Sequence, residues 1–75
     1  MKKDPSLREL GERIRVARKS KGLSQEALAF AAGIDRSYMG GVERGERNLS
    51  FKKMFRIVEV LECDLAAFTK GLPIK

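Results

Sequence analysis

Histidine and tryptophan are absent from the 75 residues of this sequence, which contains a single cysteine. Without histidine, a Ser–His or Cys–His nucleophile cannot be built, and the commonest metal-binding side chain is missing. The sequence also has no glycine-rich phosphate-binding loop. We therefore expect no enzyme activity, no metal site and no cofactor. A single cysteine cannot form an internal disulfide, which is typical of a reducing cytoplasm.

Long apolar runs are also missing, since no segment approaches the roughly 20 residues needed to cross a bilayer. Residues 1–13 carry positive charge but lead into no apolar run, so we expect no signal peptide. A basic helix over residues 7–21 would lack the aromatic anchors of a membrane-surface helix. The one cysteine, Cys63, lies between Leu61 and Leu65, which predicts a small buried apolar residue.

Positive charge is what the sequence has in excess. Its 16 Lys and Arg residues against 10 Asp and Glu residues give a formal net charge of +6. This balance favours an anionic partner such as nucleic acid, although an ordinary solvated basic surface would give the same count. We expect one domain over residues 1–75, with flexible ends at 1–4 and 72–75. A chain of this length buries only about 60% of its unfolded surface and leaves no room for a small-molecule pocket.

Apolar residues recur at helical spacing, and no segment alternates apolar and polar residues as a strand would. The first helical segment starts at Pro5 and runs to about Lys21, with an inward stripe of Leu7, Leu10, Ile14 and Ala17. Four shorter segments follow at about 25–32, 36–44, 51–61 and 64–71. Each has a candidate capping residue at or just before its start: Ser24, Asp35, Ser50 and Asp64. The pattern predicts an all-α domain with short connections.

Residues 25–44 read as two short helices joined by a tight turn. Gly33 stands where the chain must turn, because glycine enters the left-handed region without steric cost. The residues predicted to face inward are Leu28, Ala29, Ala32, Ile34, Met39 and Val42. The residues predicted to face outward are Arg36, Ser37, Gly40, Gly41 and Arg44. This outer face is short and basic, as a helix entering a DNA major groove requires.

With Ala29, Gly33, Ile34, Met39 and Val42 in these places, the stretch resembles the helix-turn-helix of the XRE (phage repressor and Cro-like) regulators. The segment DRSYMGGVERGERNLS, residues 35–50, is especially similar to the controller proteins of restriction–modification systems. The resemblance implies a compact five-helix, lambda-repressor-like domain in which the second and third helices read DNA.

Arg36 and Ser37 open the third helix, whose first turn points most directly at base edges. An arginine there can bind guanine O6 and N7 in a bidentate fork, whereas the hydroxyl of Ser37 reads bases ambiguously and can bind a phosphate instead. The alternative is an exposed arginine that forms a weak surface pair with Asp35. Gly40 and Gly41 depart from the family pattern, in which side chains at these positions touch bases. Their absence either lets the helix backbone approach the bases closely or loosens a helix that orders on DNA.

Phosphate contacts are expected around the same surface. The N-terminus of the second helix presents backbone N–H groups to phosphate, and the resemblance adds that Gln25 binds phosphate and braces Arg36. Tyr38 can reach a phosphate through its hydroxyl or pack as a half-buried core residue. The full set of expected phosphate contacts is Ser24, Gln25, Tyr38, Arg44, Arg47, Asn48, Lys52 and Lys53.

The resemblance also implies a buried ion pair between Arg18 and Glu43. Related proteins dimerise through the fifth helix and the turn before it, which makes Leu49, Phe55, Leu65 and Phe68 candidates for a dimer face. The alternative is that these residues complete the core together with the inward stripe of the fourth helix: Phe51, Met54, Ile57, Val58 and Leu61.

Together these features predict a cytoplasmic, nucleoid-associated regulator of bacterial or phage origin that binds double-stranded DNA at a near-palindromic operator as a homodimer. The resemblance points to the control of a restriction–modification operon. A different class remains open, namely an antitoxin-type protein-interaction module in which DNA binding is secondary. We expect no membrane partner and no small-molecule substrate.

Overall fold

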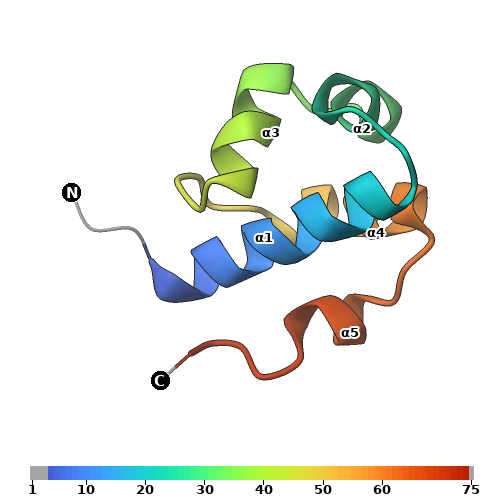
Figure 1. The fold of residues 1–75 in the computed structure, drawn as a ribbon. Helices are drawn as coiled ribbons and strands as arrows, with labels where there is room; N and C mark the ends of the chain where they lie inside the picture. The colour runs from blue at the N-terminus through green and yellow to red at the C-terminus, as the bar shows by residue number, and fades with distance from the viewer. Residues whose placement is uncertain (1–3, 75) are drawn as a thin grey trace.

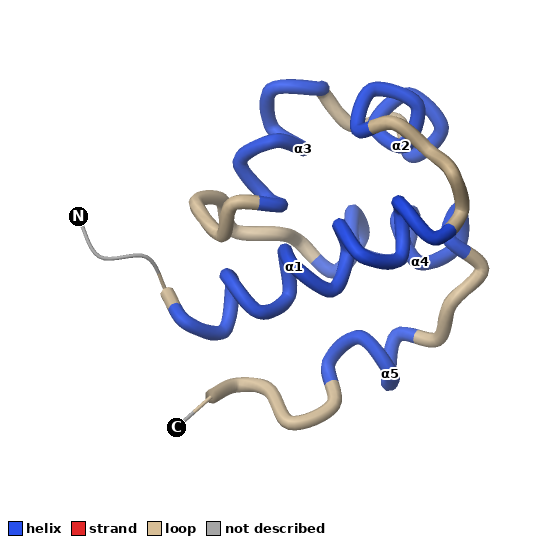
Figure 2. The backbone as a smooth tube through the Cα atoms, in the orientation of Figure 1, coloured by secondary structure: helices blue, strands red, loops and turns tan. Residues whose placement is uncertain are grey.

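The computed structural model describes residues 4–74, which form five α-helices and no strand. The helices are α1 (Pro5–Ser20), α2 (Gln25–Ala32), α3 (Arg36–Glu43), α4 (Phe51–Leu61) and α5 (Leu65–Thr69). In Figure 1, α2 and α3 lie on one side of α1 and α5 lies on the other; the tube in Figure 2 shows how short the connections are. The all-α, five-helix prediction is confirmed. Of the residues expected to be flexible, 1–3 and 75 lie outside the described part of the chain.

Side-chain caps start four of the five helices. Ser24, Asp35 and Ser50 each accept a hydrogen bond from the backbone amide three residues further on, at 3.0, 3.1 and 3.2 Å. These caps satisfy amides that have no partner inside their helix. Asp4, which we placed in a flexible arm, caps α1 by accepting from the amides of residues 6 and 7. Asp64 precedes α5 but makes no side-chain cap hydrogen bond.

The turn between α2 and α3 is fixed by one backbone conformation. Gly33 ends α2 in the left-handed region at a φ of 68°, as its position in the sequence predicted. The next amide, that of Ile34, donates to the carbonyl of Ala29 at 2.8 Å and turns the Ile34 side chain into the core. The turn therefore sets the direction in which α3 leaves α2.

The core is formed by twelve buried apolar side chains from all five helices and the α2–α3 turn: Ile14, Leu28, Ala29, Ala32, Ile34, Met39, Val42, Met54, Ile57, Val58, Leu61 and Phe68. Phe51, which we expected in the core, is 76% exposed. It is the first residue of α4, and the buried stripe of that helix begins three residues later at Met54. The prediction that Phe51 is inward was wrong.

Cys63 is exposed, so its predicted burial was also wrong. The reason lies in Glu62, which leaves the helical conformation at a φ of 56° and ends α4. The amide of Cys63 then donates to the carbonyl of Val58 at 2.9 Å, which turns the chain away from the buried stripe. Helical periodicity therefore stops one residue before the cysteine.

Gly11 lies at a close approach between α1 and the end of α3. A methyl group at this position would lie 2.6 Å from the carbonyl oxygen of Glu43, which belongs to the backbone and cannot rotate away. Overpacking of this kind costs about 1–3 kcal/mol, more than the roughly 1 kcal/mol that alanine gains over glycine inside a helix.

Gly11→Ala is therefore expected to lower the free energy of unfolding by up to about 2 kcal/mol, measured by urea denaturation. Ser20→Ala, at the exposed end of the same helix, should change it by less than about 0.5 kcal/mol. A Gly11→Ala variant more stable than the parent would show that α1 and α3 are not this closely packed.

Candidate nucleic-acid interface

The first turn of α3 faces solvent. Arg36 and Ser37 are both exposed, as predicted. Among residues 4–74, Arg36 makes no ion pair, and the carboxylate of Asp35 accepts instead from the amide of Tyr38 at 3.1 Å. The surface pair between Asp35 and Arg36 is thus not formed in the described structure. Arg36 is therefore exposed and has no acidic partner among residues 4–74.

Gly40 and Gly41 are buried, which corrects the prediction that they form part of the open outer face. The amide oxygen of Gln25 and the guanidinium of Arg44 lie over Gly40, and the side chain of Arg47 lies over Gly41. The covering groups come from α2 and from the residues after α3. Helical periodicity gives the face on which a residue lies, but it does not reveal a side chain laid across that face from elsewhere.

Gln25 connects α2 to α3. Its Nε2 donates to Oε1 of Glu43 at 3.2 Å. Within the described residues this bond replaces the brace onto Arg36 that the family resemblance implied. Ser24 is exposed, and its hydroxyl accepts the capping hydrogen bond from Ala27. The start of α2 is therefore anchored to the last residue of α3.

Arg18 and Glu43 form the predicted ion pair in a buried position. Nε and Nη2 of Arg18 donate to the two carboxylate oxygens of Glu43 at 2.7 and 2.9 Å, and Nη1 donates to the carbonyl of Leu23 at 3.0 Å. The hydrogen bonds to Glu43 raise the pKa of Arg18 above its usual value, against the opposing effect of burial. Arg18 stays protonated, and the bidentate geometry fixes α1 relative to the end of α3.

Tyr38 holds the loop that follows α3. It is half-buried, and its hydroxyl donates to the backbone carbonyl of Asn48. The ammonium of Lys53 lies 3.9 Å from the ring centroid and the guanidinium carbon of Arg47 lies 5.8 Å from it, both within the range of cation–π attraction. Tyr38 thus attracts Arg47 of the loop and Lys53 of α4 to its ring, next to α3. Its hydroxyl is already hydrogen-bonded within the protein.

The remaining cations flank this surface. Lys52 is exposed on the first turn of α4, and Asn48 is exposed in the loop before that helix. Arg44 is exposed and its Nε lies 3.0 Å from Oε1 of Glu46, so a phosphate would compete with this carboxylate for the guanidinium. Of the expected phosphate-binding residues, Arg47 and Lys53 therefore meet at the Tyr38 ring, and Gln25 and Arg44 meet over Gly40. Ser24, Asn48 and Lys52 are exposed.

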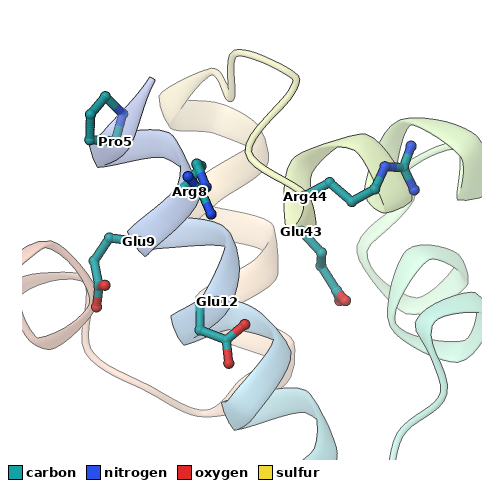
Figure 3. Close-up of a pocket in the computed structure, with 6 residues that line it drawn as sticks. All are labelled: Pro5, Arg8, Glu9, Glu12, Glu43 and Arg44. Carbon is teal, nitrogen blue, oxygen red and sulfur yellow. The ribbon is translucent and has the colours of Figure 1, made fainter. Parts of the chain in front are cut away.

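A depression of about 500 Å³ lies beside this surface, between α1 and the end of α3. Figure 3 shows Glu43 pointing between the two helices and Arg44 extending away from α1. The depression is lined by two arginines, three glutamates and a proline: Pro5, Arg8, Glu9, Glu12, Glu43 and Arg44.

In the described residues there is no group of acidic or cysteine side chains that could hold a metal ion, and no helix could cross a membrane.

The candidate dimer residues divide into two groups. Phe68 is only 5% exposed and belongs to the core, which is the alternative that the sequence left open. Leu49 and Leu65 are half-buried, and Phe55 is 53% exposed. Phe51 stacks on Phe55 with ring centroids 6.2 Å apart. Sequence reasoning missed this exposed aromatic pair, although its spacing of four residues on one helix was the available signal.

Comparison with known proteins places these features in context. A model of the helix-turn-helix family matches residues 14–68. Control protein C.BamHI of Bacillus amyloliquefaciens is 40% identical over 63 residues, which cover 79% of this chain and 78% of that protein. Control protein C.SmaI of Serratia marcescens is 40% identical over 52 residues, or 69% of this chain, and the match spans 62% of the length of that relative.

Solved structures agree with these relatives. The restriction–modification controller protein C.AhdI from Aeromonas hydrophila has 47% sequence identity and a TM-score of 0.80, covering 83% of this chain and 94% of that chain. C.Esp1396I bound to a 25 base pair operator site has 37% identity and a TM-score of 0.73, covering 83% of this chain and 82% of that chain. The arrangement of all five helices is therefore shared with restriction–modification controller proteins.

Proposed function

This chain belongs to the helix-turn-helix family, and we propose that it controls a restriction–modification operon by binding a near-palindromic operator as a homodimer. Its similarity to controller proteins makes it a DNA-binding transcriptional regulator rather than an enzyme. The cell compartment that fits this role is the bacterial cytoplasm, at the nucleoid.

The observation that carries this proposal is the exposed, basic first turn of α3. Arg36 is presented outward, without an ion pair among residues 4–74, on a helix whose far end is anchored by the buried Arg18–Glu43 pair. A similar structure, that of C.Esp1396I, was solved bound to operator DNA. In the role we propose, Arg36 and Ser37 read base edges in the major groove, while Gln25, Lys52 and Lys53 contact phosphates.

Dimerisation is supported by geometry and by the exposed aromatic pair. One recognition helix reads too few base pairs for useful specificity, whereas a two-fold dimer reads two half-sites about 34 Å apart. We propose that the dimer face contains Leu49, Phe55 and Leu65, joined by Phe51. Phe68 supports this face from inside the core and does not itself contact the partner.

Salt dependence tests the electrostatic part of the proposal. If each subunit neutralises about five phosphates, log K for the dimer should fall linearly with log salt concentration at a slope near −9. Binding of labelled operator DNA would be measured by fluorescence anisotropy over a series of salt concentrations. A slope near zero would contradict a surface that works through Arg and Lys contacts to phosphate.

A further inference from the structure

We propose that Gly40 and Gly41 form a seat on α3 for side chains that reach the DNA from outside this helix, and that Gly41 positions Arg47 there. This inference rests on the proposed function and extends it to two residues that have no side chain of their own. The proposal also explains why Gly40 and Gly41 are buried on a face of α3 that the sequence predicted to be open to solvent.

The contact at Gly41 is the tighter of the two. A methyl group at this position would lie 2.6 Å from Cγ of Arg47, with Cδ and Nε of the same side chain at 3.5 and 3.4 Å. Ordinary contact begins at 3.4 Å, so the Arg47 side chain would have to move by about 0.8 Å at Cγ. The stem of Arg47 therefore lies directly on the backbone of α3.

Both ends of this arrangement are fixed. The carbonyl of Gly41 accepts from the amide of Glu46 at 2.8 Å, which ties the loop carrying Arg47 to α3. At the other end, the guanidinium of Arg47 lies 5.8 Å from the centre of the Tyr38 ring. The side chain thus runs over α3 from Gly41 toward Tyr38, and its charged group lies beside the Tyr38 ring.

Gly40 also leaves room for covering side chains, but the contacts there are less close than those at Gly41. A methyl group there would lie 3.2 Å from Oε1 of Gln25 and 3.1 Å from Nη1 of Arg44. Both atoms are at the ends of flexible side chains, so a shift of a few tenths of an ångström would relieve the contact. We expect Gly40 to tolerate alanine better than Gly41 does.

Helix propensity supports a positioning role over a purely structural one. Glycine is among the least favourable residues inside a helix, yet two occur in succession in the eight residues of α3. If the pair served only to loosen α3, alanine at either position would stiffen the helix, and the shift of Arg47 would leave operator affinity unchanged. If the pair is a seat, alanine at Gly41 displaces Arg47 while the helix itself gains from the substitution.

A double-mutant cycle tests this distinction. Operator affinity would be measured for the parent protein, Gly41→Ala, Arg47→Ala and the double variant, and for Gly40→Ala as the milder case, in which only the ends of flexible side chains must shift. We expect Gly41→Ala to weaken binding about tenfold, Gly40→Ala to weaken it less than threefold, and the double variant to bind no more weakly than Arg47→Ala alone. An equal loss from Gly41→Ala in both backgrounds, or no loss at all, would overturn the proposal.

A measurement without DNA separates this inference from the proposed function. In the NMR spectrum of the free protein, Gly41→Ala should shift the side-chain Nε–H signal of Arg47 and the ring signals of Tyr38, while the urea midpoint does not fall. Unchanged signals would overturn the seat even if the protein binds its operator normally. If the parent protein binds no operator, the proposed function is refuted, and the NMR spectrum alone then tests whether Gly41 positions Arg47.

If Gly41→Ala does not fold, the double variant should fold, because it lacks the Arg47 stem that obstructs the new methyl group. If the double variant does not fold either, the proposal is wrong.

Discussion

Replacing Arg36 with alanine should weaken operator binding by about 2–6 kcal/mol for the dimer, or roughly 30-fold to 10⁴-fold. A bidentate contact between arginine and guanine is worth about 1–3 kcal/mol of discrimination, and the dimer would contain two of them. Arg36 is exposed and makes no ion pair within residues 4–74, so its removal should cost the fold little. The loss should fall on affinity for the operator and much less on affinity for unrelated DNA.

Two variants separate base reading from charge. Lys19→Ala removes the same charge from an exposed position on α1 that is not among the proposed DNA contacts, and should reduce operator affinity only slightly. Arg36→Lys keeps the charge but loses the planar fork, so it should not restore discrimination. If Arg36→Ala and Lys19→Ala lowered binding to operator and unrelated DNA equally, Arg36 would not be a base-reading residue.

Glu43→Ala should lower the free energy of unfolding by about 3–5 kcal/mol, because it leaves the Arg18 guanidinium buried without its carboxylate partner. The substitution also removes the acceptor for Nε2 of Gln25. For a 75-residue chain this is a large part of the total stability, which is typically 5–15 kcal/mol for folded domains. Urea denaturation followed by circular dichroism would measure the change.

Glu9→Ala is the matched control for this prediction. Glu9 pairs with Arg13 at 2.9 Å one helical turn away, but its side chain is 43% exposed. Exposed pairs of this kind contribute about 0–1 kcal/mol. If the two substitutions had similar effects, the Arg18–Glu43 pair would not be the anchor that fixes α3.

Local chemistry made the helices predictable. Ser24, Asp35 and Ser50 are caps because their side chains bond to amides only three residues away, and Gly33 turns the chain because of its own backbone freedom. The Arg18–Glu43 pair joins residues 25 apart in the sequence, and it was predicted from the family resemblance rather than from local pattern.

The errors at Cys63, Gly40 and Gly41 arose outside the regular helical pattern. Cys63 lies outside the core because Glu62 adopts a left-handed conformation that is rare for a residue with a side chain. Gly40 and Gly41 are covered by side chains whose positions depend on the path of the loop after α3. Neither fact can be obtained from periodicity, which describes one regular helix at a time.

Selection of bound sequences from a random DNA pool, followed by determination of the stoichiometry on the strongest binder, tests the central claim most directly. We predict a near-palindromic site bound by two chains, with half-site centres about 34 Å apart and a guanine in each half that Arg36→Ala no longer distinguishes. Enrichment of an asymmetric site bound by one chain, or no enrichment of any sequence, would contradict it.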